Sequence, residues 1–284
     1  MNDHFELNNG VKMPVIGIGV FTFTPAEAQA AVEAALHDGV RLIDTANAYQ
    51  NEKATGRAIK AAGVPREDIF LVTKLWPSVY EDPNAVDDTL RRLDTDYVDM
   101  LFLHQPTDNW QAGYRNIEKA VKAGKVRSIG ISNFDIFPGL TRQAIDFAEL
   151  VPQSVQVEAH PYYPQTELKK LLAEYGIGLM AWYPLGHGDK SLIQEPVFSR
   201  LAGKYGKTNA QIVLRWHVQS GNVVIPGSRN PEHIKNNFDI LDFTLSDEEM
   251  AQIAALDKNV RYYNGTREDV AGYKAWAPNF DEQE

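Results

Sequence analysis

The stretch TPAEAQAAVEAALHDGVRLIDT, residues 24–45, holds one helix signal followed by one strand signal. Thr24 and Glu27 are spaced as a capping box with proline at the first helical position, and Gly39 marks the end of the helix. The run Arg41–Thr45 then carries mainly apolar residues. Nearly continuous apolar runs are typical of parallel strands that helices cover. The stretch therefore predicts one unit of a chain in which helices and strands alternate.

The same alternation continues along the whole chain. The predicted strands are eight short apolar runs: Val15–Gly19, Arg41–Thr45, Ile69–Lys74, Val98–His104, Arg127–Ser132, Ser154–His160, Gly178–Pro184 and Asn222–Pro226. Helix starts are predicted by capping boxes at Thr208–Gln211 and Ser246–Glu249, and by the pair Asp82-Pro83. Eight strand–helix units without a Ser/Gly-rich linker favour a closed (β/α)8 TIM barrel over an open doubly wound sheet. We expect residues 1–284 to form this one α/β domain.

Three segments fall outside the eight units. Asn8-Asn9-Gly10 predicts the turn of an N-terminal β-hairpin. Glu195–Gly206 is typical of an additional helix between the seventh and eighth strands. The tail from Arg261 onward is rich in Tyr, Trp, Gly and Pro and has no helical period, so we expect a C-terminal loop over the active-site face of the barrel.

Composition and charge exclude several functions. The chain has 28 Lys+Arg against 38 Asp+Glu, and the net charge of −10 disfavours nucleic acid or an anionic membrane as the main partner. It contains no cysteine, which excludes disulfides, thiolate nucleophiles and sulfur-ligated metals. The N-terminus lacks a basic, apolar leader pattern, and no apolar run approaches the roughly 20 residues of a membrane span. We expect a cytoplasmic monomer.

Polar residues end three of the predicted strands. Asp44 ends the second strand, Lys74 the third and His104 the fourth, and Tyr49 lies in the loop after Asp44. Each residue alone has an ordinary structural interpretation, as a cap, a solvated charge, a hydrogen-bonded imidazole or a packed ring. Together they are expected to converge, because the carboxyl ends of barrel strands meet at one rim and form the active site there.

These four side chains would make a proton donor for a carbonyl group. A free phenol has a pKa near 10, so Tyr49 is a weak acid until a neighbouring ammonium, here Lys74, stabilises its phenolate and lowers that pKa. Asp44 would keep Lys74 charged and aimed, and His104 would hydrogen-bond the substrate oxygen. The predicted chemistry is protonation of a developing oxyanion, which requires a partner that delivers hydride to carbon.

The motifs around these residues resemble those of the aldo-keto reductase superfamily over nearly the whole chain. They are Asp44-Thr45-Ala46, Tyr49-Gln50-Asn51-Glu52, Thr73-Lys74-Leu75-Trp76, Leu103-His104 and Gly130-Ile131-Ser132-Asn133-Phe134. The sequence of residues Ala181–Gly186 and the chain length are similar to those of bacterial 2,5-diketo-D-gluconate reductases. The resemblance implies a metal-free (β/α)8 barrel, hydride transfer from NADPH or NADH to a small carbonyl substrate, and a catalytic tetrad of Asp44, Tyr49, Lys74 and His104 with Tyr49 as general acid.

The resemblance also implies where coenzyme and substrate bind. Its cofactor residues are Ser132, Asn133 and Gln156 at the nicotinamide amide, Trp182 stacked on the nicotinamide ring, Leu185 in the same loop, and Ser228, Arg229, His233 and Asn237 at the adenosine end. On the residues alone, the loop Pro226–Asn230 is either a plain turn or an anion site, because exposed N–H groups at the helix start that follows favour phosphate. Phe21, Trp76 and Gln105 are expected to line the substrate pocket.

Four positions depart from the family pattern. Gly227 stands where a Lys is usual and His233 where an Arg is usual, so two cationic contacts to a 2′-phosphate are missing or weakened. Each such contact is worth about 1.5–3 kcal/mol, which predicts a weakened NADPH preference and real use of NADH, with Arg229 replacing part of the lost charge. Val155 replaces an Asn, and Gln105 replaces a Trp and should make the pocket less aromatic.

Two other interpretations of the chain remain open, and two common motifs are excluded. Gly17-Ile18-Gly19 is no dinucleotide fingerprint because the third glycine position is Thr22, and Phe134 rules out a nucleophile elbow. A barrel aldolase would use Lys74 as a Schiff-base nucleophile. A non-catalytic nicotinamide-binding redox sensor would use the coenzyme site alone.

Overall fold

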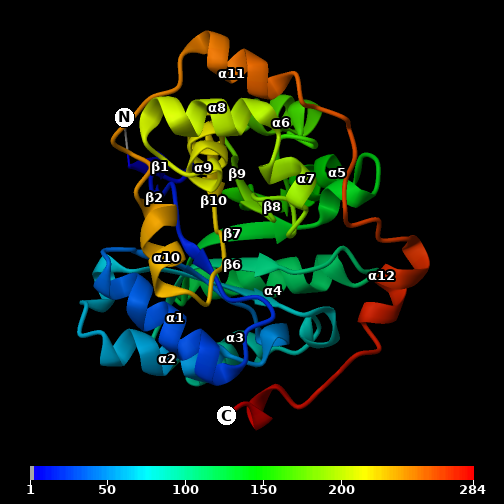
Figure 1. Cartoon of the computed structure of the whole chain (residues 1–284). Helices are drawn as coiled ribbons and strands as arrows, with labels where there is room; N and C mark the ends of the chain where they lie inside the picture. Colours follow the sequence, from blue (N-terminus) through cyan, green and yellow to red (C-terminus); the bar gives the residue numbers. More distant parts are fainter. Residues whose placement is uncertain (1–2) are drawn as a thin grey trace.

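Eight parallel strands form the barrel of the computed structural model, which describes residues 3–284. In hydrogen-bonded order they are β3 (Ile18–Gly19), β4 (Leu42–Asp44), β5 (Phe70–Leu75), β6 (Val98–Leu103), β7 (Val126–Ser132), β8 (Ser154–Glu158), β9 (Gly178–Trp182) and β10 (Asn222–Val224). A parallel bridge between Ile16 and Val224 brings the first strand segment against the last. The predicted (β/α)8 barrel is confirmed (Figure 1). Each strand of the barrel extends at most one residue beyond its predicted run.

Helices cover the outside of the barrel (Figure 1). They are α1 (Pro25–His37), α2 (Glu52–Ala61), α3 (Ala85–Leu93), α4 (Trp110–Lys122), α5 (Leu140–Phe147), α6 (Thr166–Ala173), α7 (Lys190–Ile193), α8 (Pro196–Tyr205), α9 (Asn209–Gln219), α10 (Pro231–Phe238), α11 (Asp247–Ala254) and α12 (Arg267–Tyr273). The capping boxes at Thr24, Thr208 and Ser246 are confirmed, as is the additional helix, which is α8. Within residues 3–284 no helix is both long and apolar enough to cross a membrane.

The N-terminal hairpin closes one end of the barrel. β1 (His4–Glu6) pairs antiparallel with β2 (Lys12–Pro14), and the turn between them uses Gly10 at a φ of +80°. Leu7 and Met13 are buried together with inward-facing residues of the strands, among them Phe102. The predicted hairpin is therefore confirmed, and it packs against the interior of the barrel.

Two expectations about local structure were wrong. The pair Asp82-Pro83 does not start a helix: the Asp82 carboxylate accepts a hydrogen bond from the backbone N–H of Asn84, 2.9 Å away, and this local turn delays α3 to Ala85. The tail is not only a loop, because Thr266 and Asp269 form a capping box that starts α12. The expected position of the tail is correct at α12, since the indole Nε1 of Trp76 donates to the carbonyl of Tyr273 at 2.9 Å.

Gly130 is required by the close packing of two neighbouring strands. A Cβ at Gly130 of β7 would lie 2.2 Å from the ring of Phe102 in β6, its direct partner in the sheet. Overpacking a core typically costs about 1–3 kcal/mol, so Gly130→Ala should lower the free energy of unfolding by this amount in urea denaturation. Gly203→Ala is the matched control, because Gly203 in α8 is surrounded by open space within residues 3–284. Equal losses in the two variants would contradict the packing argument.

His217 predicts a loss of stability at acidic pH. Its Nε2 lies 3.1 Å from the carbonyl oxygen of Pro184 and its Nδ1 lies 3.0 Å from Nδ2 of Asn222, so the neutral imidazole is fully paired. Burial lowers the pKa of His217 to about 3. The unfolded chain, with a His pKa near 6.5, therefore binds a proton that the native chain does not bind. The free energy of unfolding falls as the pH drops from about 6.5 towards 3, and the loss is about 2 kcal/mol at pH 5. Urea denaturation at pH 7 and pH 5 should show a smaller loss in His217→Gln than in the wild type.

Candidate active site

A buried ion pair lies inside the carboxyl-terminal end of the barrel. The Nζ of Lys74 in β5 lies 2.6 Å from Oδ1 of Asp44 in β4 and donates to the carbonyl of Thr45 at 2.9 Å. The two side chains are 1% and 2% exposed. Gln156 of β8 donates to the other carboxylate oxygen of Asp44 at 2.8 Å. Burial lowers the pKa of Lys74 and raises that of Asp44, while the pairing opposes both shifts and so favours the charged forms.

Tyr49 lies next to this pair at the end of a short 3₁₀ turn, η1 (Asn47–Tyr49). The Lys74 Nζ is 4.9 Å from the centroid of the Tyr49 ring, and the His104 ring is 5.5 Å away in an edge-on arrangement. Burial, followed by the charge of Asp44, raises the pKa of Tyr49 well above its ordinary value. The expected lowering of this pKa by Lys74 is therefore wrong for the protein alone, because loss of solvent around the phenolate and the charge of Asp44 both raise it. Tyr49 is a protonated phenol at neutral pH.

His104 follows β6 and is a neutral imidazole at neutral pH. Burial and the nearby charge of Lys74 lower its pKa well below the ordinary value for histidine. Its backbone carbonyl accepts a hydrogen bond from Nδ2 of Asn133 at 3.1 Å. Its ring Nδ1 is buried and, among residues 3–284, has no hydrogen-bond partner. A buried polar atom without a partner is costly, so the His104 ring fits a site where a ligand supplies a polar atom.

Aromatic rings line the site around Tyr49 and His104. Phe21 lies 5.1 Å from Tyr49 and Trp76 lies 5.1 Å from His104, as ring centroids. Trp276 from the tail lies 5.4 Å from Trp76. Phe21 and Trp276 are 48% and 45% exposed, and exposed aromatic side chains beside a polar cluster mark a ligand site. We call Phe21, Trp76, Tyr273 and Trp276 the aromatic wall.

The aromatic wall changes one expectation about the pocket. Gln105 is buried, and its backbone exchanges hydrogen bonds of 2.9 Å with the hydroxyl of Tyr80. The pocket was expected to be less aromatic because of Gln105, but the tail supplies Tyr273 and Trp276 against Trp76. The tail sequence contains these aromatic residues, but their position depends on the path of α12.

The residues expected at the nicotinamide lie beside the four central residues. Ser132 is buried at the end of β7 and pairs with Gln156, which is buried in the middle of β8. Asn133 has a left-handed backbone with φ of +64°, and its side chain lies between Trp182 and the backbone of His104. Its Oδ1 accepts from the indole of Trp182 at 3.0 Å, while its Nδ2 donates to the carbonyl of His104. Leu185, in the turn after β9, is partly buried against the core.

The residues expected at the adenosine end lie in the loop before α10 and along that helix. Ser228 accepts from the backbone N–H of Asn230 at 3.1 Å, Asn237 is buried and His233 is exposed. Arg229 forms an ion pair of 2.8 Å with Glu27 and donates to the carbonyl of Thr22 at 2.6 Å. Its guanidinium is therefore already paired, which weakens its expected role as a replacement cation.

The sequence analysis missed a buried carboxylate at the end of β8. Glu158 accepts the backbone N–H groups of Tyr262 and Tyr263 at 2.6 and 2.8 Å, and its Oε1 lies 2.9 Å from Nε2 of His160. These contacts fix the start of the tail at the rim, where the ring of Tyr263 faces Trp182. The signal that identified Asp44, a polar residue at the end of an apolar strand, also applies to Glu158.

A (β/α)8 barrel that gathers a buried lysine–carboxylate pair, a protonated phenol and a neutral imidazole at its carboxyl-terminal rim belongs to the class of barrel enzymes that act on polar groups of small ligands. Residues 15–258 match the model of the aldo/keto reductase family. The chain is 45% identical over 268 residues to an aldo-keto reductase of Mycolicibacterium smegmatis, covering 92% of this chain and 96% of that one.

Two further comparisons agree. The chain is 40% identical over 260 residues to methylglyoxal reductase DkgA of Escherichia coli, covering 90% of this chain and 94% of that one. The crystal structure of an aldo/keto reductase from Brucella melitensis is similar with a TM-score of 0.84 at 41% identity, covering 89% of this chain and 99% of that one. The chain belongs to the aldo/keto reductase family, and the resemblance found in the sequence is confirmed.

Proposed function

We propose that this protein reduces aldehydes, ketones or keto sugars with NADPH or NADH, and that Tyr49 is the general acid. One observation carries the proposal: the Tyr49 ring lies 4.9 Å from the ammonium of Lys74 and 5.5 Å from the His104 ring, inside an aromatic wall. The relative named methylglyoxal reductase supports a small dicarbonyl as one substrate.

Each polar group has one role in the proposed mechanism. His104 donates a hydrogen bond that holds the substrate oxygen, and the protonated Tyr49 donates its proton to that oxygen as negative charge develops there. The ammonium of Lys74 stabilises the resulting phenolate, and Asp44 keeps the ammonium charged and aimed. The aromatic wall excludes water from the oxygen.

The residues around Trp182 fit a nicotinamide coenzyme. Ser132, Asn133 and Gln156 offer amide and hydroxyl groups, and Asn133 fixes the indole of Trp182 through the 3.0 Å hydrogen bond. These residues would hold a reduced nicotinamide, which would supply the hydride for the carbonyl carbon. The unpartnered Nδ1 of His104 further supports a ligand at this rim.

The proposal is tested by following the absorbance of NADH and NADPH with a panel of carbonyl compounds that includes methylglyoxal. Turnover with at least one aldehyde or ketone is expected, and its absence across the panel would defeat the proposal. A Schiff-base aldolase is disfavoured, because the Lys74 amine is held by Asp44 and Thr45 as a buried ammonium. Borohydride trapping with a carbonyl compound, without nicotinamide, checks this alternative.

The coenzyme preference is a further expected outcome. A Cβ at Gly227 would lie 2.8 Å from the carbonyl oxygen of Gly19, so the lysine usual there does not fit this backbone, and Arg229 is paired with Glu27. We expect kcat/KM for NADPH to exceed that for NADH by less than about a thousandfold, since two contacts of about 1.5–3 kcal/mol each are missing. His233→Arg should raise this ratio by about tenfold or more. Steady-state kinetics with both coenzymes checks it, and an unchanged ratio in His233→Arg would contradict the assignment.

A further inference from the structure

The loop that carries Tyr49 is fastened at three points to β5 and to the residue that follows it. The Nζ of Lys74 donates to the carbonyl of Thr45 at 2.9 Å, before Tyr49. The backbone N–H of Trp76 donates to the side chain of Asn47 at 3.0 Å. The hydroxyl of Thr73 donates to Oε1 of Glu52 at 2.7 Å, after Tyr49. The position of Tyr49 relative to Lys74 therefore depends on both ends of this loop.

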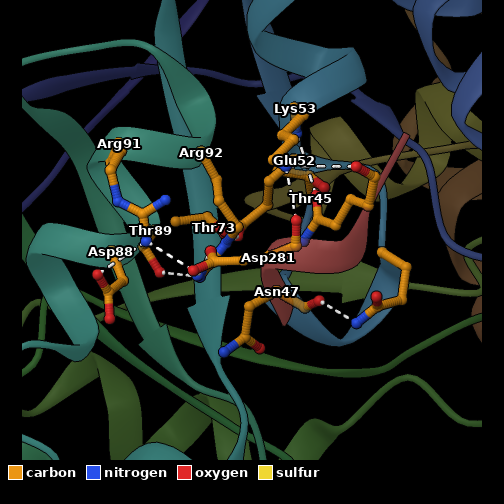
Figure 2. Close-up of polar contacts among 12 residues, drawn as sticks. Thr45, Asn47, Glu52, Lys53, Thr73, Asp88, Thr89, Arg91, Arg92 and Asp281 are labelled. Carbon is orange, nitrogen blue, oxygen red and sulfur yellow. Dashed lines mark hydrogen bonds and ion pairs between the residues drawn. The ribbon is translucent and has the colours of Figure 1, made fainter. Parts of the chain in front are cut away.

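Glu52 is buried between α2 and α3 and is paired on both carboxylate oxygens. It is the first residue of α2, is fully buried, and accepts from Nε of Arg92 in α3 at 2.6 Å (Figure 2). The side chain of Arg92 is only 4% exposed. Thr73 and Lys74 are neighbours in β5, so their side chains point to opposite faces of the strand. The Glu52 carboxylate thus lies across the strand from the ammonium of Lys74.

Charges of alternating sign continue from the active site to the surface. Asp44 and Lys74 form the inner pair, and Glu52 and Arg92 form the next. Asp281 in the tail then contacts Arg92 at 3.3 Å. At the surface Asp281 also contacts Arg91 at 2.8 Å, and Arg91 contacts Asp88 at 2.9 Å (Figure 2). We call this series the charge row.

We propose that Glu52 is a positioning residue for the active site, which fastens the Tyr49 loop to β5 through Thr73 and places a buried carboxylate behind Lys74. This role in catalysis rests on the function proposed above. Inside the barrel Lys74 faces Asp44 from β4, Tyr49 from η1 and His104 after β6, while Glu52 of α2 lies on the other side of β5. Glu52 also raises the pKa of Lys74, as Asp44 does, against the effect of burial.

The charge row sets opposite signs for two substitutions. Glu52→Gln removes a negative charge behind Lys74 and leaves the cation of Arg92 without its buried partner, so the pKa of Lys74 should fall. Arg92→Met removes the cation, and Glu52 is ionised at the alkaline pH where a lysine titrates, so the pKa of Lys74 should rise. Glu52→Asp keeps the charge and should stay close to the wild type.

The test follows the titration of Lys74 itself. The ¹³Cε resonance of Lys74 in lysine-labelled protein, assigned by its loss in Lys74→Met, is titrated in each variant alongside thermal unfolding and the pH dependence of carbonyl reduction. Glu118→Gln is the matched control, because Glu118 is 2% exposed and paired with Arg115 at 2.5 Å, on α4. It should lower stability and leave the pKa of Lys74 unchanged.

The positioning role would be supported if the pKa of Lys74 shifted in opposite directions in Glu52→Gln and Arg92→Met and the pH profile of turnover shifted with it. Glu52→Asp should then show a Lys74 pKa and a pH profile close to those of the wild type. An unmoved Lys74 resonance in Glu52→Gln, with a stability loss like that of Glu118→Gln, would overturn it. If Glu52→Gln does not fold, Arg92→Met decides alone: a raised pKa of Lys74 supports the proposal, and an unchanged or lowered one refutes it. Absence of carbonyl reduction in the wild type would defeat the proposed function separately, because the Lys74 titration needs no turnover.

Discussion

Tyr49→Phe removes nearly all carbonyl reduction and leaves coenzyme binding close to that of the wild type. A positioned general acid contributes about 10²–10⁴-fold to a rate, and the phenylalanine ring preserves the contacts with Phe21 and His104 while it deletes the hydroxyl. We expect kcat to fall by about a thousandfold, within that range. Steady-state kinetics measures this loss, and tryptophan fluorescence titration measures the dissociation constants of NADPH and NADH.

Tyr205→Phe is the matched control for this experiment. The hydroxyl of Tyr205 bonds to Glu249 and to the carbonyl of Thr244 at the α8–α11 side of the barrel, and its loss should leave kcat unchanged. A Tyr49→Phe variant that retains a tenth or more of wild-type kcat would show that another group protonates the oxygen. A parallel loss of coenzyme affinity would instead show that Tyr49 acts mainly in binding.

The strands could be predicted from the sequence because they are buried on both faces. The run that includes Val98–Leu103 is apolar apart from Asp99, and the structure confirms β6 over these residues. Helix starts were predictable where a side chain caps the helix, as at Thr24. The same local pattern failed at Asp82, where the carboxylate bonds within a turn. Single-residue choices between a cap and a turn depend on backbone angles that the residue types do not determine.

The site was predictable only where one local rule applied. The rule is that polar residues at the ends of apolar strands meet at one rim of the barrel. It applies to Asp44, Lys74 and His104 and predicts their common location. Glu52 looks like an ordinary acidic residue in the first turn of a helix. Its burial depends on Arg92, which lies 40 positions later in the chain. Long-range pairing of this kind leaves no periodic signal in the sequence.

Lys74→Met should abolish turnover and also destabilise the fold, and a second substitution should separate the two effects. Removing one partner of a buried ion pair leaves an uncompensated charge and costs about 3–5 kcal/mol. The carboxylate of Asp44 is 2% exposed and, apart from Lys74, accepts only the 2.8 Å hydrogen bond from Gln156 among residues 3–284. Urea denaturation at pH 7 should show this loss of unfolding free energy.

The pH dependence of Lys74→Met follows from the charge left on Asp44. In the unfolded chain the pKa of Asp44 is near 3.9. In the folded variant, which lacks the ammonium, burial raises the pKa of Asp44 above that value. The folded variant therefore gains relative stability at acidic pH, where Asp44 is protonated, and loses it as the pH rises above about 4. The deficit relative to the wild type should shrink between pH 7 and pH 4.5.

The double variant Asp44→Leu/Lys74→Met should recover part of the stability without any activity. Replacing both members of a buried pair by apolar side chains is often nearly neutral, although Gln156 and the carbonyl of Thr45 each lose a partner here. We expect the double variant to be more stable than Lys74→Met by about 1–3 kcal/mol at pH 7, with kcat still at background. If turnover returned together with stability, the lysine would serve the fold and not the proton transfer, because an apolar pair has no charge with which to stabilise the phenolate of Tyr49.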